Sequence, residues 1–516
     1  MSLKSYGMDP KRLARHLKAS RDNWRTKALE KQKKLRVVEQ RIRDLEKSRE
    51  QWKAKAKEAE KRIKELEKPT KKTNSSSPCQ TLKPIKAYQH HYSIQTIQTS
   101  LQLVIYGGSS YRSTQMIMKV LMEDFEGSSP QCSSIRNWVA RVGLYELHRQ
   151  KEKRDDWIFM VDLTLELGQE KALIVYGISQ EKFQKIIKEE KRALAHKDGE
   201  ILALEVTKKA TGEIIHEKLE WLSTKVGIPQ QILGDHGSNL KRGIQLYQKE
   251  HPQVIYTYDV THAMSNLLKQ ELTQDESYQK FLKSCRECGL ALQQTELAFL
   301  APPAQRSQCR YFNVERLVHW GKQLLKVRRE VILNLISPDE RNFIAQRLEQ
   351  KLSWLSDYEK SLKRWETMIV LTRTLEAQVK AKGLNRKSRE EFEAEISSLE
   401  IPDNLWKFKE KIVGYIEVEV SKITIKNSIL ATTDVVESLF GKYKNFSSRC
   451  PLKDLRQMLL TIPLSTLELT NDLVKKALES IRGIDLKNWV EEVFGLSMLS
   501  KRKTVFSTTK NGMKSV

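Results

Sequence analysis

The stretch Trp157-Ile-Phe-Met-Val-Asp162-Leu-Thr-Leu165 decides the fold of this chain, because it is an apolar run with an acidic residue inside it. A second such run, Gln231-Ile-Leu-Gly-Asp235-His-Gly237, ends in an acidic residue. A third acidic residue lies within the helical pattern Thr433-Asp-Val-Val-Glu437-Ser-Leu-Phe440. A carboxylate is costly to bury unless something neutralises it, and a divalent cation held by oxygen ligands does so. These three residues are therefore the candidate metal ligands.

Short β-rich runs around the first stretch predict the order of elements in a central α/β core. Strands are expected at 158–165, 172–176, 201–206, 231–234 and 254–258, with helices at 211–226 and 239–249. The order is three strands, helix, strand, helix, strand. It predicts a mixed sheet in which an antiparallel part is followed by parallel strands.

The rest of the chain reads as helices and linkers. The core is expected in two parts, 155–262 and 429–497, separated by an all-helical insertion at 263–428. Before the core, apolar residues spaced alternately by three and four predict a coiled coil at 8–68. A Pro- and Ser-containing linker at 69–88 and a helical domain at 89–150 follow. Residues 498–516 form a basic tail that we expect to be disordered.

Composition favours a nucleic-acid partner. The 516 residues include 91 Lys and Arg against 65 Asp and Glu, a formal net charge of +26, and a chain this basic associates with a polyanion. No run of about 18 uncharged apolar residues predicts a membrane span, and no export signal is evident. Six cysteines do not make a disulfide framework. We expect a reducing, cytoplasmic setting, with the nucleoid or nucleus as the place of work.

The motif Cys285-Arg-Glu-Cys288 is a single CxxC pair. A structural zinc site needs four ligands, and although Cys309 and His319 follow, no second pair has a convincing spacing. Reduced thiols on a helix face are the favoured interpretation, and zinc is the alternative.

Within 89–150, two short helices joined by a turn fit a helix-turn-helix DNA reader. The second helix carries Arg136, Asn137 and Arg141 near its start, and these are the candidate DNA-binding residues. The alternative is an ordinary helical hairpin.

The three acidic residues suit metal-dependent phosphoryl transfer. Two hard cations about 3.5–4 Å apart activate an attacking oxygen and stabilise the leaving one, and Mg²⁺ or Mn²⁺ takes carboxylate ligands. Asp162 would bridge both ions, Asp235 would bind one and Glu437 the other. No Ser–His–Asp or Cys–His signature competes with this interpretation.

Each assignment has a rival. Asp155 or Asp156 could replace Asp162, and Asp235 could merely cap the helix after it. Asp434 and Glu417 are the rivals of Glu437.

Four strings together resemble the DDE transposases of the ribonuclease-H-like superfamily, of the bacterial insertion-sequence type. They are Val161-Asp-Leu-Thr164, Leu233-Gly-Asp-His-Gly-Ser-Asn239, Asp259-Val-Thr-His262 and Asp434-Val-Val-Glu-Ser-Leu-Phe-Gly-Lys-Tyr-Lys444. The third resembles the Cys/Asp-x-x-His string of hAT and Mutator-like transposases, where a long helical insertion also occurs. This resemblance implies a role for His262 near the scissile phosphate or the metals.

The last string also resembles a Glu-x6-Lys signature whose Lys contacts DNA phosphate, so Lys442 and Lys444 join the candidate DNA-binding residues. The Tyr of that signature is replaced by Thr433, and its Arg is missing.

The resemblance implies a transposase that binds the ends of its own element, cleaves DNA and transfers the 3′-hydroxyl ends to target DNA. Two ends must be handled together, so at least a homodimer is expected, and the coiled coil offers one route to it. Two alternatives remain: a nuclease of the same fold that does not join strands, and a coiled-coil DNA-binding protein with an inactive core.

Overall fold

The computed structural model describes residues 85–512, apart from 123–128, 166–170, 305–313, 328, 335–340, 425–426 and 449–455, together with the single residues Arg21, Gln32 and Glu50. The chain divides into two compact units, Met1–Leu82 and Lys83–Val516. The predicted coiled coil at 8–68 and the linker at 69–88 therefore fall outside the described residues, except for those three positions and 85–88.

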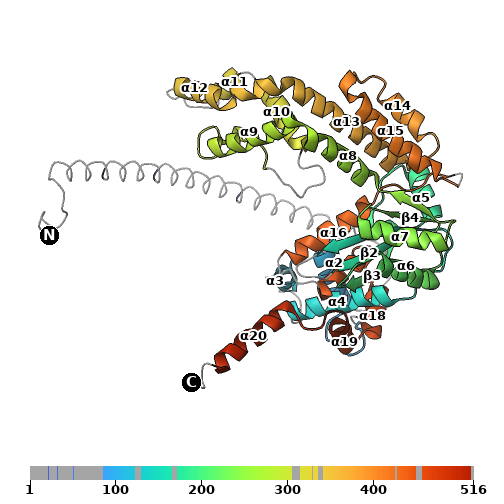
Figure 1. Ribbon diagram of the computed structural model, residues 1–516. Helices are drawn as coiled ribbons and strands as arrows, with labels where there is room; N and C mark the ends of the chain where they lie inside the picture. Colours follow the sequence, from blue (N-terminus) through green and yellow to red (C-terminus); the bar gives the residue numbers. More distant parts are fainter. Residues whose placement is uncertain are drawn as a thin grey trace, which may run out of the picture. The chain divides into compact units, whose positions relative to one another are not determined.

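The second unit is built on a mixed five-stranded sheet in the order β3-β2-β1-β4-β5, seen in Figure 1. β1 pairs antiparallel with β2 and parallel with β4, which makes it the central strand. β2 pairs antiparallel with β3, and β4 pairs parallel with β5. The bounds are β1 (Trp157–Leu165), β2 (Lys171–Ser179), β3 (Glu200–Thr207), β4 (Gln231–Gly234) and β5 (Ile255–Tyr258). Each predicted strand is present, and β2 extends to Ser179 instead of ending at Tyr176.

Helices cover both faces of β1, as expected for a strand whose apolar residues do not alternate with polar ones. Phe159 and Val161 pack against α6 (Gly212–Val226) and α7 (Ser238–Glu250). Ile158 and Met160 point to the other face, where they share a core with α16 (Asp434–Ser447). The segment between β2 and β3 contains the short α5 (Gln180–Lys185), a π-helical turn η2 (Ile186–Glu190) and a 3-10 turn η3 (His196–Asp198).

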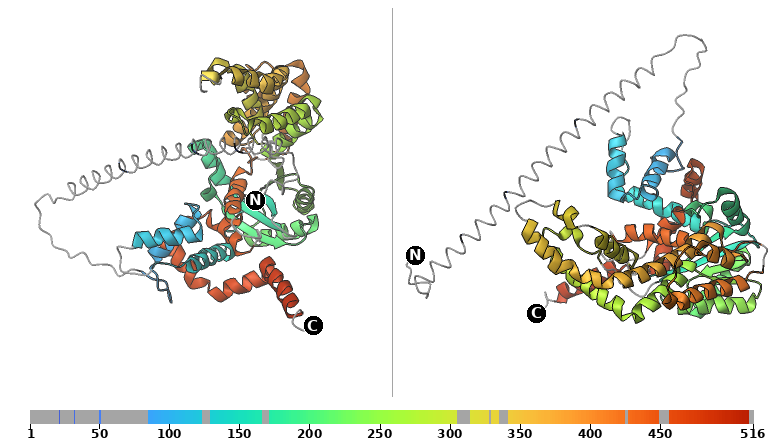
Figure 2. Two further views of the ribbon diagram at one scale, coloured as in Figure 1. Left: turned by 90° about the vertical axis from the view of Figure 1, so that its left-hand side faces the viewer. Right: turned by 90° about the horizontal axis from the view of Figure 1, so that it is seen from above.

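Between β5 and α16 the described chain is helical. The helices are α8 (Val260–Gln274), α9 (Glu276–Leu292), α10 (Val314–Lys326), α11 (Arg329–Asn334), α12 (Arg341–Leu352), α13 (Glu359–Lys382), α14 (Ser388–Glu395) and α15 (Trp406–Ser421). They have a core of their own around the fully buried Trp365, whose indole N–H donates to Asp275 at 2.7 Å. Figure 2 shows these helices gathered beside the sheet. The predicted all-helical insertion is thus present.

The helices before the sheet do not form a core by themselves. They are α2 (Ile94–Ile105), α3 (Tyr111–Met122) and α4 (Cys132–His148), and they share two apolar clusters with α17 (Thr461–Leu464), α18 (Asn471–Ser480) and α19 (Gly483–Phe494). Figure 2 shows the two groups together, blue to cyan and red. The region predicted as a domain at 89–150 is therefore completed by residues from the other end of the chain.

The basic tail predicted to be disordered begins with a helix, α20 (Met498–Gly512). The sequence Met498-Leu-Ser-Lys-Arg-Lys-Thr-Val-Phe506 lacks Pro and Gly, so nothing in it stops a helix, and disorder was the wrong expectation for this part. In the described part of the chain, no helix combines the length and the apolar character needed to cross a bilayer.

Candidate active site at the carboxyl ends of β1 and β4

Asp162 and Asp235 lie at the same edge of the sheet. β1 and β4 run parallel, and their last paired residues are Val161 and Gly234, so each acidic residue follows its partnered position by one residue. Side chains alternate along a strand. Because Met160 points toward α16, Asp162 falls on that face too, and it is half-buried. Asp162 within β1 and Asp235 just after β4 thus lie where the parallel pairing of the two strands ends.

Asp235 shapes the turn between β4 and α7. Its Oδ1 accepts a hydrogen bond from the Gly237 N–H at 3.0 Å, and its carbonyl accepts one from the Tyr256 hydroxyl at 2.9 Å. Gly237 is the N-cap residue of α7. Asp235 therefore orders the loop before the helix without being its N-cap, and its half-buried carboxylate remains at the sheet edge.

Glu437 sits in the first turn of α16, on the helix that packs against β1. Val436, Leu439 and Phe440 anchor this helix in the core shared with Ile158 and Met160. Glu437 lies at the border of that buried face, and its Oε1 is shielded from solvent. A carboxylate from a segment about 200 positions after β4 is thereby carried to the face of the sheet that bears Asp162.

The three carboxylates do not all come within 4.8 Å of one another, since in the described part of the chain only His216, Glu220 and Glu250 form such a group. Ligands shared between two ions about 3.5–4 Å apart need not be that close, because each ion takes only some of them. Three oxygen-donor side chains nevertheless suit Mg²⁺ or Mn²⁺, which prefer such ligands and retain waters.

The rival residues occupy other places. Asp156, at the opposite end of β1, binds Arg154 at 2.8 Å, and Asp155 beside it is exposed. Glu417 is an exposed residue of α15 that pairs with Arg389. These three carboxylates are not at the edge formed by Val161 and Gly234.

Asp434, the other rival, faces the helical insertion instead. It binds Lys380 of α13 at 2.7 Å and Thr261 of α8 at 3.3 Å. The geometry therefore favours Asp162 and Glu437 over their alternatives.

Asp259 joins the core to α16. It is fully buried, and its Oδ1 accepts from the His262 N–H at 2.6 Å while its Oδ2 accepts from the N–H and hydroxyl of Thr433 at 2.6 and 2.9 Å. Burial by itself would raise the pKa of Asp259, but the bonds and charge of His262 and the Thr433 N–H outweigh it, so the pKa is lowered. The Asp259 N–H also donates to Gly234 at 3.1 Å. Asp259 thus ties the end of β4, through its backbone N–H, to the start of α16, through its carboxylate.

His262 is held by this arrangement, with Nδ1 3.3 Å from the Asp259 carboxylate. It lies in the first turn of α8, four residues after Tyr258, the last residue of β5. The sequence pattern Asp259-x-x-His262 thus corresponds to a helix cap and its neighbour, and a direct part for His262 in chemistry stays a prediction.

His236 is a residue that the sequence reasoning missed. Its ring stacks on Tyr258 with centroids 3.6 Å apart, directly beside Asp235. Burial, together with Lys241 and Lys422, lowers its pKa to about 4, so its imidazole is neutral at pH 7. The only signal available in the sequence was its position next to Asp235.

The candidate DNA-binding residues of α4 differ in how exposed they are. Arg136 is exposed and Asn137 is half-buried on α4. Arg141 is only 8% exposed, and its guanidinium donates to the carbonyls of Leu478 and Ile481 at the end of α18. A guanidinium engaged in this way is poorly placed to reach a base edge, and the assignment of Arg141 to DNA binding stays a prediction.

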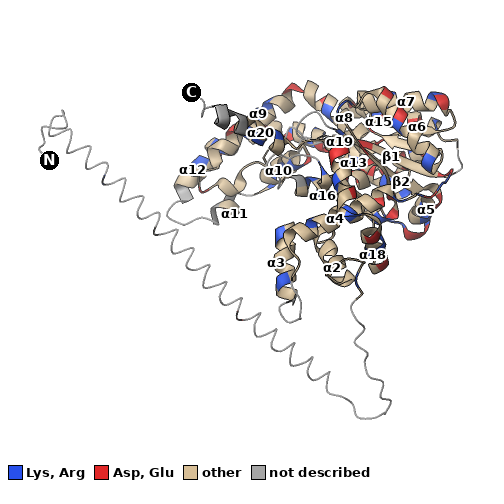
Figure 3. Cartoon of the chain, turned by 90° about the horizontal axis from the view of Figure 1, so that it is seen from below, with Lys and Arg blue, Asp and Glu red and all other residues tan. Residues whose placement is uncertain are grey.

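Lys442 and Lys444 lie on α16, and Figure 3 marks Lys and Arg positions in blue on α16, α3 and α4. Lys444 is exposed and Lys442 is half-buried. Burial and the charge of Lys197 lower the pKa of Lys442, and burial and Lys442 lower that of His196. Basic groups of α16 and η3 thus lie close together on one surface. An anionic ligand bound there would reduce the repulsion between them.

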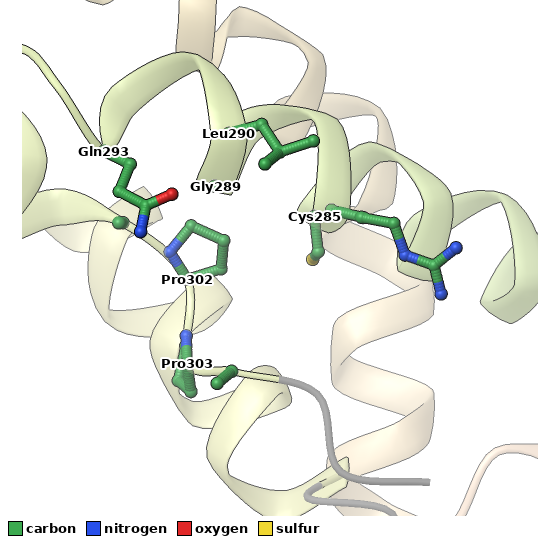
Figure 4. A pocket seen from close by; sticks show the side chains of 9 residues that line it. Cys285, Gly289, Leu290, Gln293, Pro302 and Pro303 are labelled. Atoms are coloured by element: carbon green, nitrogen blue, oxygen red, sulfur yellow. The ribbon is translucent and has the colours of Figure 1, made fainter. Parts of the chain in front are cut away.

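The CxxC pair lies in the insertion. Cys285 and Cys288 are buried on α9, and burial raises the pKa of Cys285 to about 12, so it stays a thiol. Figure 4 shows Cys285 beside a cavity of about 410 Å³ lined by residues such as Leu290, Pro302 and Pro303. Cys309 lies outside the described residues, and His319 is exposed. A thiol with a raised pKa is a weak nucleophile, and the interpretation of the pair as reduced thiols rather than zinc ligands stays a prediction.

No family model and no curated protein matches the chain. Among solved structures, "Drosophila P element transposase strand transfer complex" aligns with 76% of this chain and 94% of that chain, at 13% sequence identity and a TM-score of 0.32. A likeness at this score carries no weight for function, which we infer from the site alone.

Proposed function

We propose that the chain is a DDE-type DNA transposase with a ribonuclease-H-like core. It would bind the ends of a mobile element, cleave phosphodiester bonds and transfer the 3′-hydroxyl ends to target DNA. The observation that carries the proposal is the placement of Asp162 and Asp235 where the parallel pairing of β1 with β4 ends, on a sheet whose β1 is packed by the helix bearing Glu437. The order β3-β2-β1-β4-β5, with its antiparallel and parallel halves, supports a ribonuclease-H-like core.

The chemistry needs oxygen ligands and no protein nucleophile. Divalent cations held by Asp162, Asp235 and Glu437 would supply Lewis acidity for the attacking and leaving oxygens. The chain itself fixes where these carboxylates stand: pairing of β1 with β4 positions the first two, and Asp259 holds the start of α16 through Thr433. His236 is neutral beside Asp235, so it adds no positive charge that would repel a cation.

DNA binding would use the basic surface formed by Lys197 and Lys442, with Lys444 and Arg136 as separate contacts. The formal net charge of +26 suits a polyanion bound along an extended path. Homodimerisation through residues 8–68 and work at the nucleoid or nucleus belong to the same proposal.

The test uses the full chain and a linear DNA fragment that carries its own gene with about 1 kb of flanking DNA on each side. With Mg²⁺ and a supercoiled plasmid as target, we expect cuts at the gene's flanks and fragment joined to plasmid. Asp162→Asn, Asp235→Asn and Glu437→Gln should bind the fragment and neither cut nor join it.

Asp155→Asn is the matched control, because it removes a carboxylate from the opposite end of the same strand and should leave the products unchanged. Cutting without any joined product would identify a nuclease instead. Wild-type product levels in all three site variants would refute metal catalysis at this site.

A further inference from the structure

A second group of potential metal ligands lies on the other face of the sheet. The Nε2 atom of His216 is 3.2 Å from Oε1 of Glu250 and 3.7 Å from Oε1 of Glu220. The Nε2 atom of His251 is 2.8 Å from the same Glu220 oxygen. Two imidazoles and two carboxylates therefore meet between α6 and α7.

The fold brings these residues together. His216 and Glu220 are four positions apart on α6 and so share one side of that helix. Glu250 is the last residue of α7, and His251 is its C-cap. The two helices approach closely at Gly243, where a Cβ atom would lie 2.6 Å from Cβ of Ile215. The absence of a side chain at Gly243 therefore sets the spacing across which the ligands meet.

His251 is held in place. Its N–H donates to the Tyr247 carbonyl at 3.0 Å, its ring packs on that of Tyr247 with centroids 4.4 Å apart, and the Tyr247 hydroxyl in turn bonds to Ser223 of α6 at 2.6 Å. The side chains of His216 and His251 are 23% and 17% exposed. The group is thus partly shielded and supported from behind, while Glu250, at 59% exposure, leaves a path from solvent.

The electrostatics call for a cation. Nε2 of His216 is shielded from solvent and makes no hydrogen bond among the described residues, yet carboxylate oxygens lie on two sides of it. A lone pair facing carboxylates is repulsive, so either a proton or a metal ion must stand between them. Imidazole nitrogen combined with carboxylate oxygen suits zinc and related transition metals, whereas Mg²⁺ prefers oxygen alone.

We propose that His216, Glu220 and Glu250 bind a divalent transition-metal ion of the zinc type, with His251 orienting Glu220 or joining as a fourth ligand. The site is separate from the candidate active site. Asp235 precedes the start of α7 and Glu250 ends it, a rise of about 18 Å along the helix axis. The metal would clip the middle of α6 to the end of α7 and so steady the β4–α7–β5 unit that carries Asp235.

The test measures Zn²⁺ binding to the chelator-treated full chain by equilibrium dialysis, in a background of Asp162→Asn, Asp235→Asn and Glu437→Gln that removes the candidate active-site ligands. We expect one Zn²⁺ per chain and a rise in the thermal unfolding midpoint, with no such rise from Mg²⁺. His216→Gln should weaken Zn²⁺ binding at least tenfold, and His251→Gln should weaken it less.

Glu250→Gln keeps the test decisive, because this exposed side chain can change without disturbing the fold, and it should also weaken binding while the circular dichroism spectrum is unchanged. His319→Gln, in an exposed position on α10, is the control with wild-type affinity. Absence of stoichiometric Zn²⁺, or wild-type Zn²⁺ affinity in both His216→Gln and Glu250→Gln, would show that the group is only a set of histidine–carboxylate contacts. Because the active-site ligands are absent from this background, the result is independent of transposase activity.

Discussion

The two faces of β1 differ in what they bury. On the face toward α6 and α7, Phe159 and Val161 lie in an apolar cluster. On the face toward α16, the equally apolar Ile158 and Met160 are followed by Asp162. One face of β1 thus contributes only packing, and the other contributes packing followed by a proposed metal ligand. The difference teaches that substitutions on the two faces of one strand should separate stability from activity.

The largest expected effect comes from comparing the two faces directly. Asp162→Asn should lower Mg²⁺-dependent DNA joining at least ~100-fold, because a metal-ligating charge is lost, with little change in the free energy of unfolding. Phe159→Ala should instead cost about 3–5 kcal/mol of stability. Single-turnover joining and urea unfolding measure the two quantities. If Asp162→Asn still joins DNA at the wild-type rate, the distinction between the faces is wrong.

Asp259→Ala should weaken the packing of α16 against the face of β1 that bears Asp162. Removing a buried carboxylate that serves Thr433 and His262 should cost about 3 kcal/mol, and joining should fall because Glu437 is no longer positioned. Thr433→Val, which removes one hydroxyl, should cost about 1 kcal/mol.

The pH dependence sharpens this prediction. The pKa of Asp259 is lowered from 3.8, so its contribution is present above that pH and is lost as the pH falls through the folded-state pKa. Denaturant titrations at pH 3 to 7 measure it, and identical curves for wild type and Asp259→Ala would contradict the assigned role.

Glu376 of α13 offers a pH-dependent contrast on the same side. Its side chain is 3% exposed, and it shares Lys380 with Asp434 of α16. Burial raises the pKa of Glu376 from 4.5 to about 7 despite Lys380. The folded protein therefore binds this proton more tightly than the unfolded chain does, and the associated stability is complete below pH 4.5 and is lost as the pH rises through 7.

Glu376→Gln should abolish this loss of stability at rising pH, which amounts to about 1–3 kcal/mol between pH 4.5 and 8. Urea midpoints of the two proteins across this range measure it. If the stability of wild type and of Glu376→Gln depends on pH in the same way, the raised pKa of Glu376 is not the cause of the loss.

The smallest effect concerns α4, away from both faces. Arg136→Ala should weaken DNA binding by no more than about tenfold and reduce its salt dependence by about one ion, because one exposed cation is lost. Arg141→Ala should destabilise the helical bundle, since it leaves the carbonyls of Leu478 and Ile481 without their donor. Binding titrations at several salt concentrations distinguish these two roles. A reduced salt dependence in Arg141→Ala, with unchanged stability, would instead make Arg141 a DNA contact.

The sheet was predictable from sequence because its strands are continuous apolar runs bounded by polar turns. The run from Trp157 to Leu165 and the one ending at Gly234 needed no knowledge of their partners. The edge at which Asp162 and Asp235 meet then followed from the parallel order. Such features depend only on residues that are neighbours in the chain, so a single sequence is enough to predict them.

Features that depend on distant partners were not predictable. Nothing near Arg141 signals that the end of α18 needs a hydrogen-bond donor, because that partner lies more than 300 positions away. The bond from Thr433 to Asp259 spans 174 positions, so a motif that resembled a catalytic string is also a structural junction. The His216 group likewise depends on how closely α6 and α7 pack at Gly243.

The most direct test of the central claim replaces Mg²⁺ by Fe²⁺ in the full-length protein and adds ascorbate and peroxide, so that radicals formed at the bound ion cut the nearest backbone. We expect cuts near Asp162, Asp235 and Glu437 together, suppressed by excess Mg²⁺ and absent in Asp162→Asn. Cuts near His216 and Glu250 should resist Mg²⁺. Cutting at only one of the three acidic residues, or an unchanged pattern in Asp162→Asn, would contradict a shared metal site.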